Sequence, residues 1–302
     1  MSTPDRDQRQ RFLFEHSDIR GEILSLESSY QTTLSKANYP PAIARLLGEF
    51  LAGACLLSGT LKFEGSISLQ ASGRGSLRLI MAECSHHQNI RAIAQTRPDL
   101  LATSLDEANA EEAPGLKTLL GANATLAVTI NPERGERYQG IIPIESDSLS
   151  QCLESYFRQS EQLATGIWLS ANGQRAAGLL IQALPEGVQS TDAREEHWRH
   201  LCHLASTLSA QEQLELSHNT ILHRLFHEQS LRLFTPAEMS FSCTCSSART
   251  LEALASFGKE ELQAMLAETN PVEVTCQFCH HHYHFTRADI ESAFKSTTAT
   301  MH

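Results

Sequence analysis

Two closely spaced cysteine pairs lie near the C-terminus of this 302-residue chain. One residue separates Cys243 from Cys245, two separate Cys276 from Cys279, and thirty residues lie between the pairs. Four thiolates brought together by one loop can bind a tetrahedral zinc ion, and the same thiols can be oxidised to two local disulfides. Zinc binding and oxidation exclude each other, because a sulfur atom in a disulfide is no longer a thiolate ligand.

Composition and the N-terminal residues indicate a folded protein of a reducing compartment. The chain is 41% hydrophobic and 20% charged, which is ordinary for a globular protein. Met1–Arg11 is polar without the apolar run of a signal peptide, and no stretch approaches membrane-spanning length. We therefore expect a cytoplasmic protein without a membrane partner, in which paired cysteines bind metal or do redox work.

The charge balance argues against nucleic acid as a partner. The formal net charge is −11, and Ser240–His302 carries four Lys or Arg against seven Asp or Glu. Such a segment has no strong electrostatic attraction to phosphate. This counts against one alternative, a constitutive zinc-ribbon module that binds nucleic acid or protein.

Residues 1–187 have the pattern of a mixed sheet and helix domain, and the predicted fold class is α+β. The periodicity predicts strands at Arg11–Glu15, Ile19–Glu27 and Gly178–Leu184, hairpins turning at Ser72–Gly75 and Asn131–Glu136, and helices at Ala42–Leu57 and Ser150–Leu163. We expect the Ser72–Gly75 turn to require positive φ. The sequence Pro185–Gly187 predicts the end of this domain.

Residues 188–238 are predicted to form a metastable helical linker. Asp192–Phe234 is rich in charge, histidine and helix formers, and Ser209 with Glu212 fits a capping box. The predicted helices are short, and short helices are marginal in water without tertiary packing. The linker could therefore unfold locally. We expect its histidines to face solvent: His197, His200, His203, His218, His223 and His227.

Residues 239–302 are predicted to form a small zinc-binding domain. They contain few large apolar side chains, and such a unit needs an additional crosslink, which four thiolates on one zinc ion would supply. We also expect a capping box at Thr286–Asp289. We expect the neighbouring histidines to stay outside the ligand set, since four sulfurs complete a tetrahedron: His280, His281, His282 and His284. Cys276–His280 also matches a haem attachment pattern, which would leave the first cysteine pair unexplained.

The spacing within each pair bears on oxidation. Residues i and i+2 of a strand lie about 6.6 Å apart, near the upper limit for a disulfide, so a Cys243–Cys245 bridge should require bending or strain. Cys276 and Cys279 can pair more readily in a turn. For the remaining four cysteines we expect inert packing: Cys55, Cys84, Cys152 and Cys202.

Several segments together resemble the bacterial redox-regulated holdase chaperones of the heat shock protein 33 family, and the resemblance covers nearly the whole chain. The most specific parts are the two cysteine pairs, with Ser246 after the first and His282-Tyr283 after the second. Two further segments resemble the family, Asn131–Gly140 (NPERGERYQG) and Ser150–Phe157 (SQCLESYF). One departure is His280, where we expect a glycine; a residue with positive φ there would strain the turn and weaken zinc retention.

The resemblance implies a switch. In this family the reduced form, with one zinc ion per chain, is inactive; oxidation releases zinc, forms two disulfides and unfolds the linker. By position, the implied bridges are Cys243–Cys245 and Cys276–Cys279. The active form, commonly a homodimer, holds unfolding client proteins without ATP, so the protein is not expected to be an enzyme. A dithiol oxidoreductase using Cys276 and Cys279 is a further alternative, but no thioredoxin-like surround is evident.

Overall fold

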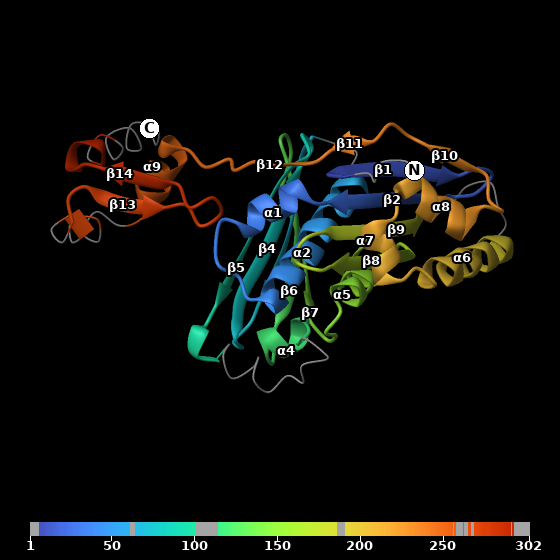
Figure 1. Cartoon of the computed structure of the whole chain (residues 1–302). Helices are drawn as coiled ribbons and strands as arrows, with labels where there is room; N and C mark the ends of the chain where they lie inside the picture. The colour runs from blue at the N-terminus through green and yellow to red at the C-terminus, as the bar shows by residue number, and fades with distance from the viewer. Residues whose placement is uncertain are drawn as a thin grey trace. The chain divides into compact units, whose positions relative to one another are not determined.

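The computed structural model describes residues 6–60, 64–100, 114–185, 191–255, 257, 262, 265–266, 269–290 and 292. The chain divides into two compact units, Met1–Ser242 and Cys243–His302. Helices and strands both contribute to the first unit (Figure 1), which confirms the predicted mixed fold.

The first sheet of unit 1 is built mainly from the two ends of that unit. Its strands run in the order β10 (Leu231–Leu233), β1 (Gln8–Phe14), β2 (Ile19–Leu26), β9 (Ala176–Ala183) and β8 (Thr165–Ala171), all antiparallel, and β11 (Ala237–Glu238) also pairs with β1. Every residue of β9 is buried, which indicates that both faces of the sheet are covered there.

The second sheet contains both predicted hairpins. Its order is β12 (Ser240–Phe241), β5 (Asn89–Thr96), β4 (Leu77–Ser85), β3 (Gly65–Ser72), β6 (Thr125–Pro132) and β7 (Tyr138–Pro143). All neighbours are antiparallel except β12 and β5, which are parallel.

The prediction of positive φ in the β3–β4 turn is wrong. Neither Gly73 nor Gly75 has positive φ. Glycine is needed there because another backbone approaches closely: a Cβ on Gly73 would lie 2.2 Å from the Leu120 carbonyl oxygen, and one on Gly75 would lie 2.3 Å from that of Leu119. Those carbonyls belong to α4 (Leu116–Leu120), a contact that local sequence does not reveal.

Helix α2 (Pro41–Thr60) packs against strands of both sheets and forms the centre of the main core. The expectation that no stretch approaches membrane-spanning length is wrong for this helix, which is long and apolar enough to cross a membrane, although 83% of its apolar window is buried inside the protein. The predicted helix at Ala42–Leu57 is confirmed. Shorter elements complete this region: α1 (Ser28–Leu34), α5 (Leu149–Tyr156) and a π-helical turn, η1 (Phe157–Glu161).

A buried ionic cluster joins β1 to the C-terminal end of α2. Glu22 is 1% exposed and receives Arg11 Nε at 2.8 Å, with Arg9 Nε at 3.6 Å from its second oxygen. Arg9 also donates to the Cys55 carbonyl, and Arg11 donates to that of Gly59. Arg11 thus completes a carbonyl, that of Gly59, among the last four that the end of a helix leaves without intrahelical partners, while Arg9 adds a bond to a carbonyl one turn earlier.

The predicted helical segment lies on the face of the first sheet opposite α2. It contains α6 (Thr191–Ser206), α7 (Ala210–Glu215) and α8 (His218–Phe226). Leu201, Ile221 and Phe226 pack in one cluster with Phe12, Phe14 and other side chains of β1, β2 and β9. The Ser209–Glu212 capping box is confirmed.

Two expectations for this segment are wrong. Helix does not extend to Phe234, because Leu231–Leu233 adds to the edge of β1 as β10. His218 does not face solvent: it is 1% exposed, and its Nε2 lies 3.1 Å from Ser25 Oγ of β2. Both differences arise from pairing with strands distant in sequence.

Unit 2 is small. It contains α9 (Ser247–Ala255) and an antiparallel hairpin of β13 (Val272–Thr275) and β14 (His282–Phe285). The predicted capping box is confirmed, since Thr286 N–H donates to Asp289 Oδ2 and Asp289 N–H donates to Thr286 Oγ1. Six apolar side chains are buried among its described residues: Leu254, Leu262, Leu266, Val272, Phe285 and Ile290.

Candidate metal and redox site

Two short turns of unit 2 carry the four cysteines. Cys243 and Cys245 precede α9, where Ser246 accepts Arg249 N–H and Arg249 Nη1 donates to the Thr244 carbonyl. Cys276 and Cys279 lie in the tight turn between β13 and β14. That turn is closed by His280 N–H donating to the Cys276 carbonyl at 2.8 Å.

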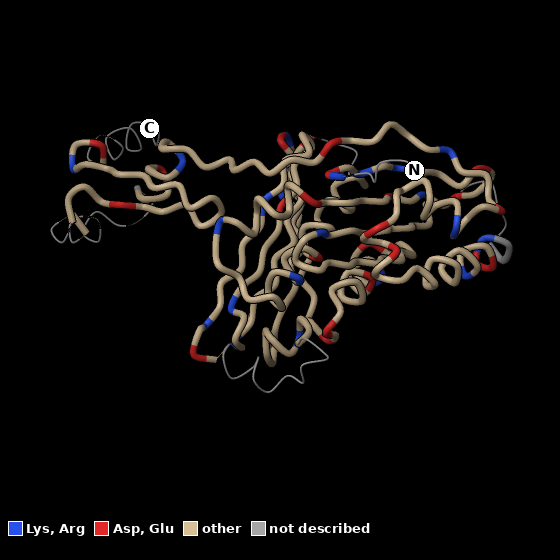
Figure 2. The backbone as a smooth tube through the Cα atoms, in the orientation of Figure 1, with Lys and Arg blue, Asp and Glu red and all other residues tan. Residues whose placement is uncertain are grey.

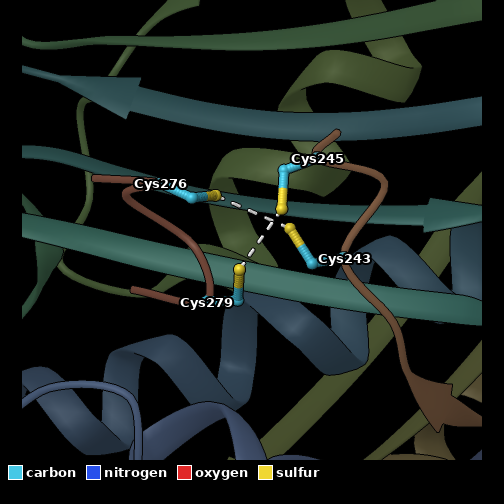
Figure 3. Close-up of side chains that lie close together, drawn as sticks. All are labelled: Cys243, Cys245, Cys276 and Cys279. Carbon is cyan, nitrogen blue, oxygen red and sulfur yellow. Dashed lines mark hydrogen bonds between the residues drawn. The ribbon is translucent and has the colours of Figure 1, made fainter. Parts of the chain in front are cut away.

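The turns bring the four sulfur atoms together, pointing at one another (Figure 3). All four Sγ atoms lie within 4.8 Å of one another, with Cys243 and Cys276 at 3.7 Å and Cys245 and Cys279 at 3.4 Å. Sulfurs bound tetrahedrally to zinc at about 2.3 Å would lie about 3.8 Å apart. The donor set and its spacing therefore fit a tetrahedral zinc ion with little rearrangement.

No histidine joins this sulfur cluster among the residues that the structure describes. His282 Nδ1 pairs with Glu273 Oε1 at 2.5 Å, and His281 packs edge-on against Tyr283 with ring centroids 4.6 Å apart. That all four histidines stay outside the ligand set remains a prediction.

Tyr283 is a contact that the spacing of the cysteines does not predict. Its hydroxyl donates to Cys245 Sγ at 3.1 Å. Partial burial opposes ionisation of Cys245, but the hydrogen bonds from Tyr283 and the other thiols outweigh it and lower its pKa to about 7. Burial and the neighbouring thiols raise the pKa of Cys279 to about 12. One thiol of the cluster is thus favoured to ionise first.

His280 adopts a φ of +56°. This confirms the expectation that the position after the second pair needs a left-handed conformation, which glycine adopts at lower cost than histidine.

The other four cysteines lie away from the cluster. Cys55, Cys84 and Cys152 are buried, and Cys202 is partly buried. Burial raises the pKa of Cys55, of Cys152 and of Cys202, the last to about 12, whereas hydrogen bonds with Cys55 and Ser58 lower that of Cys84. Their inertness stays a prediction.

Sequence comparisons agree on one family. The model for Hsp33 protein matches residues 7–286. A 33 kDa chaperonin of Hahella chejuensis is 46% identical over 292 residues, covering 97% of this chain and 98% of its own. A 33 kDa chaperonin of Pseudomonas aeruginosa is 43% identical over 290 residues, covering 95% and 94%.

A solved structure has the same fold. The crystal structure of the 33 kDa chaperonin, a heat shock protein 33 homologue, from Thermotoga maritima matches with a TM-score of 0.80 at 20% identity, covering 97% of this chain and 99% of that one. The family model and the full-length relatives define a protein of the chaperone class, and the four cysteines give it a thiol site able to hold a metal ion. The chain belongs to the Hsp33 family.

Proposed function

We propose that this protein is a redox-regulated, ATP-independent holdase, without enzymatic turnover, that protects unfolding proteins under oxidative stress in the cytoplasm. In the reduced form Cys243, Cys245, Cys276 and Cys279 hold one zinc ion per chain. The main support for this proposal is the cluster of four sulfur atoms, whose spacing fits a tetrahedral zinc ion, in a unit with a very small apolar core. Bound zinc would supply an electrostatic and covalent crosslink between the two turns.

Oxidation removes this crosslink. Each disulfide forms as two thiols lose two electrons and two protons, and a peroxide that accepts them is reduced to water. Two such steps convert all four sulfurs and release Zn²⁺. Once a sulfur has left the zinc ion, the hydrogen bond from Tyr283 favours the thiolate form of Cys245.

The choice of bridges decides what oxidation does to the fold. Family membership supports Cys243–Cys245 and Cys276–Cys279, although the shortest sulfur contacts cross between the pairs. Bridges within pairs close loops of only a few residues and leave the two turns unlinked. Crossed bridges would join residues 33 and 34 apart and would keep unit 2 closed, as zinc does. Only the first arrangement couples oxidation to unfolding.

We assign three parts to the chaperone: residues 1–187 for client binding and dimerisation, the linker at 188–238, and the switch at 239–302. Clients are unfolded proteins, bound on apolar surface that linker unfolding exposes, such as the β1 and β9 side chains under α6 and α8. The oxidised form is a homodimer. Acidic and basic residues are interspersed along the described chain (Figure 2), and this pattern with the net charge of −11 supports proteins rather than nucleic acid as partners.

The test follows four quantities during peroxide treatment at elevated temperature: released zinc, free thiols, disulfide pairing by peptide mapping, and suppression of client aggregation. We expect zinc release and chaperone activity to rise together. Equal activity of the reduced, zinc-loaded protein would reject the switch and favour a constitutive zinc-ribbon module. Crossed disulfides in the active form would reject the proposed unfolding step.

A further inference from the structure

A second group of metal-binding side chains lies in unit 1. One ring nitrogen each of His86 and His87 and one carboxylate oxygen of Glu133 lie within 4.8 Å of one another. His86 Nδ1 is 3.6 Å from Glu133 Oε1. Donors on one tetrahedral zinc, at about 2.0–2.2 Å from the metal, would be about 3.4 Å apart. We propose that His86, His87 and Glu133 form a second site, which binds a divalent transition-metal ion of borderline softness.

Backbone pairing places these three residues together. His86 and His87 occupy the turn between β4 and β5, and Glu133 directly follows β6. The end of β3 lies between them: His86 N–H donates to the Gly65 carbonyl at 2.8 Å, and Glu133 N–H donates to that of Glu64 at 2.9 Å. The two ligand-bearing turns are thus fixed to the same end of β3, and the site is positioned by sheet register.

The histidine turn is ordered before any ion binds. Gln88 N–H donates to the Ser85 carbonyl at 2.9 Å, and Asn89 N–H donates to Ser85 Oγ at 3.3 Å. Gly65 N and O lie 3.2 and 3.3 Å from His86 Nδ1 and orient that ring. These backbone contacts fix the imidazole and reduce the entropy lost on binding, but they engage Nδ1 itself: a metal ion on Nδ1 replaces the Gly65 N–H, whereas one on Nε2 leaves that contact in place.

The donor types define the class of ion. Two imidazoles with one carboxylate suit Zn²⁺, Ni²⁺ or Co²⁺, whereas Mg²⁺ and Ca²⁺ prefer oxygen ligands. Three protein donors leave coordination positions for water, and His87 and Glu133 are exposed. The site is therefore open and exchangeable, in contrast to the four-sulfur cluster, which is saturated by protein ligands.

Nickel titration of the reduced, full-length protein loaded with one equivalent of zinc tests this site. We expect one further saturable equivalent of Ni²⁺ without a thiolate-to-nickel absorption band and without zinc release. Paramagnetic broadening should be strongest for the amide resonances of residues 64–66, 85–88 and 132–134. His87→Asn and Glu133→Gln, both at exposed positions, should each weaken binding by at least about tenfold.

The matched control is His223→Asn. His223 on α8 and His227, the residue that caps the C-terminal end of this helix, have ring centroids 5.9 Å apart and form a competing histidine pair. The control should bind Ni²⁺ as the parent protein does, and circular dichroism should show that all variants are folded. Absence of a saturable second equivalent would overturn the proposal. So would unchanged binding in His87→Asn, or broadening centred on α8 or on His280–His284.

Discussion

The two units of this chain are stabilised by different means. In unit 1, four layers bury two large apolar clusters, one on each face of the first sheet: the layers are the helices α6 to α8, the first sheet, α2 and the second sheet. In unit 2, only six apolar side chains are buried among the described residues, and four thiols gather in a separate cluster that could hold a metal ion. A fold that depends on ligated sulfur can be switched by oxidation, whereas one that depends on apolar burial cannot.

The largest expected difference between the units comes from removing the metal. Chelation in the presence of reductant, or Cys276→Ser, should unfold unit 2, because structural zinc supplies about 10 kcal/mol or more of folding free energy. Hydrogen exchange should show β13 and β14 losing protection while β3 and β4 retain theirs. Cys202→Ser is the control and should leave zinc stoichiometry and unit 2 unchanged. Protected β13 and β14 amides without zinc would contradict this view of unit 2.

The second prediction compares the apolar clusters on the two faces of the first sheet. Phe226 is 1% exposed and contacts Phe14 edge-on with ring centroids 5.1 Å apart. Phe226→Ala should cost about 3–5 kcal/mol and should release α8 from the sheet. We therefore expect faster amide exchange in α6 to α8 and chaperone activity in the reduced protein.

Leu126→Ala is the matched change on the other side of α2, in the core with the second sheet. It should lower stability by about 2–5 kcal/mol without activating the reduced protein. Equal activation by both substitutions would mean that general instability, and not release of the helical layer, exposes the client surface.

A smaller effect depends on pH and concerns unit 1. Burial raises the pKa of Glu49 on α2 to about 7, while Arg45 opposes the shift. Because the pKa of Glu49 is higher in the folded protein than in the unfolded chain, the contribution of protonated Glu49 to the free energy of unfolding is fully present below about pH 4.5. This contribution is lost as the pH rises through 7. Glu49→Gln should therefore stabilise unit 1 at pH 8 by at most about 3 kcal/mol and have little effect at pH 4.5.

Denaturant unfolding of the parent protein and of Glu49→Gln from pH 4.5 to 8 measures how the free energy of unfolding of each depends on pH. Glu136→Gln, at an exposed position in the β6–β7 turn, is the control and should not change this dependence. A parallel pH dependence for Glu49→Gln and the parent protein would show that Glu49 is ionised at little cost.

The smallest predicted effect lies in the second cysteine turn. His280→Gly should relieve the left-handed strain at φ +56° and stabilise zinc-bound unit 2 by about 1 kcal/mol, which is about fivefold in zinc affinity. Competition with a zinc chelator measures this change. His284→Gly, in β14 without positive φ, should lower stability instead. Weaker zinc binding by His280→Gly would contradict the strain argument.

Local sequence predicts the elements and the cluster well, because both depend on short-range patterns. The alternation in β1 and β2, the helical spacing in α2 and the paired cysteines are all read within windows of a few residues. What it misses depends on contacts between distant segments. His218 is buried against β2, where it contacts Ser25. Strand β10 forms because Leu231–Leu233 pairs with the edge of β1, and Gly73 is required because the backbone of Leu120 approaches it closely.

In the candidate site, too, local sequence predicts some features, whereas others depend on contacts between distant segments. The identity of the four thiols follows from their spacing, whereas the left-handed conformation of His280 is expected from the family resemblance, which implies a glycine in the turn after the second pair. The hydroxyl of Tyr283 on Cys245 depends on how β14 passes the first turn, 38 residues further along the chain. The cluster of His86, His87 and Glu133 likewise requires the register of β3 with β4 and β6.

The pairing of β10 with β1 gives the helical segment a fixed end after α8, and β9 gives it one before α6. If its helices melt, the segment becomes a closed loop of roughly 50 residues and not a free tail. A free chain of that length spans about 40 Å from end to end, and because both ends of the loop are fixed its middle lies about 20 Å from them. A client caught on this loop stays within that radius of the exposed sheet, so binding to the loop raises its local concentration at the sheet face.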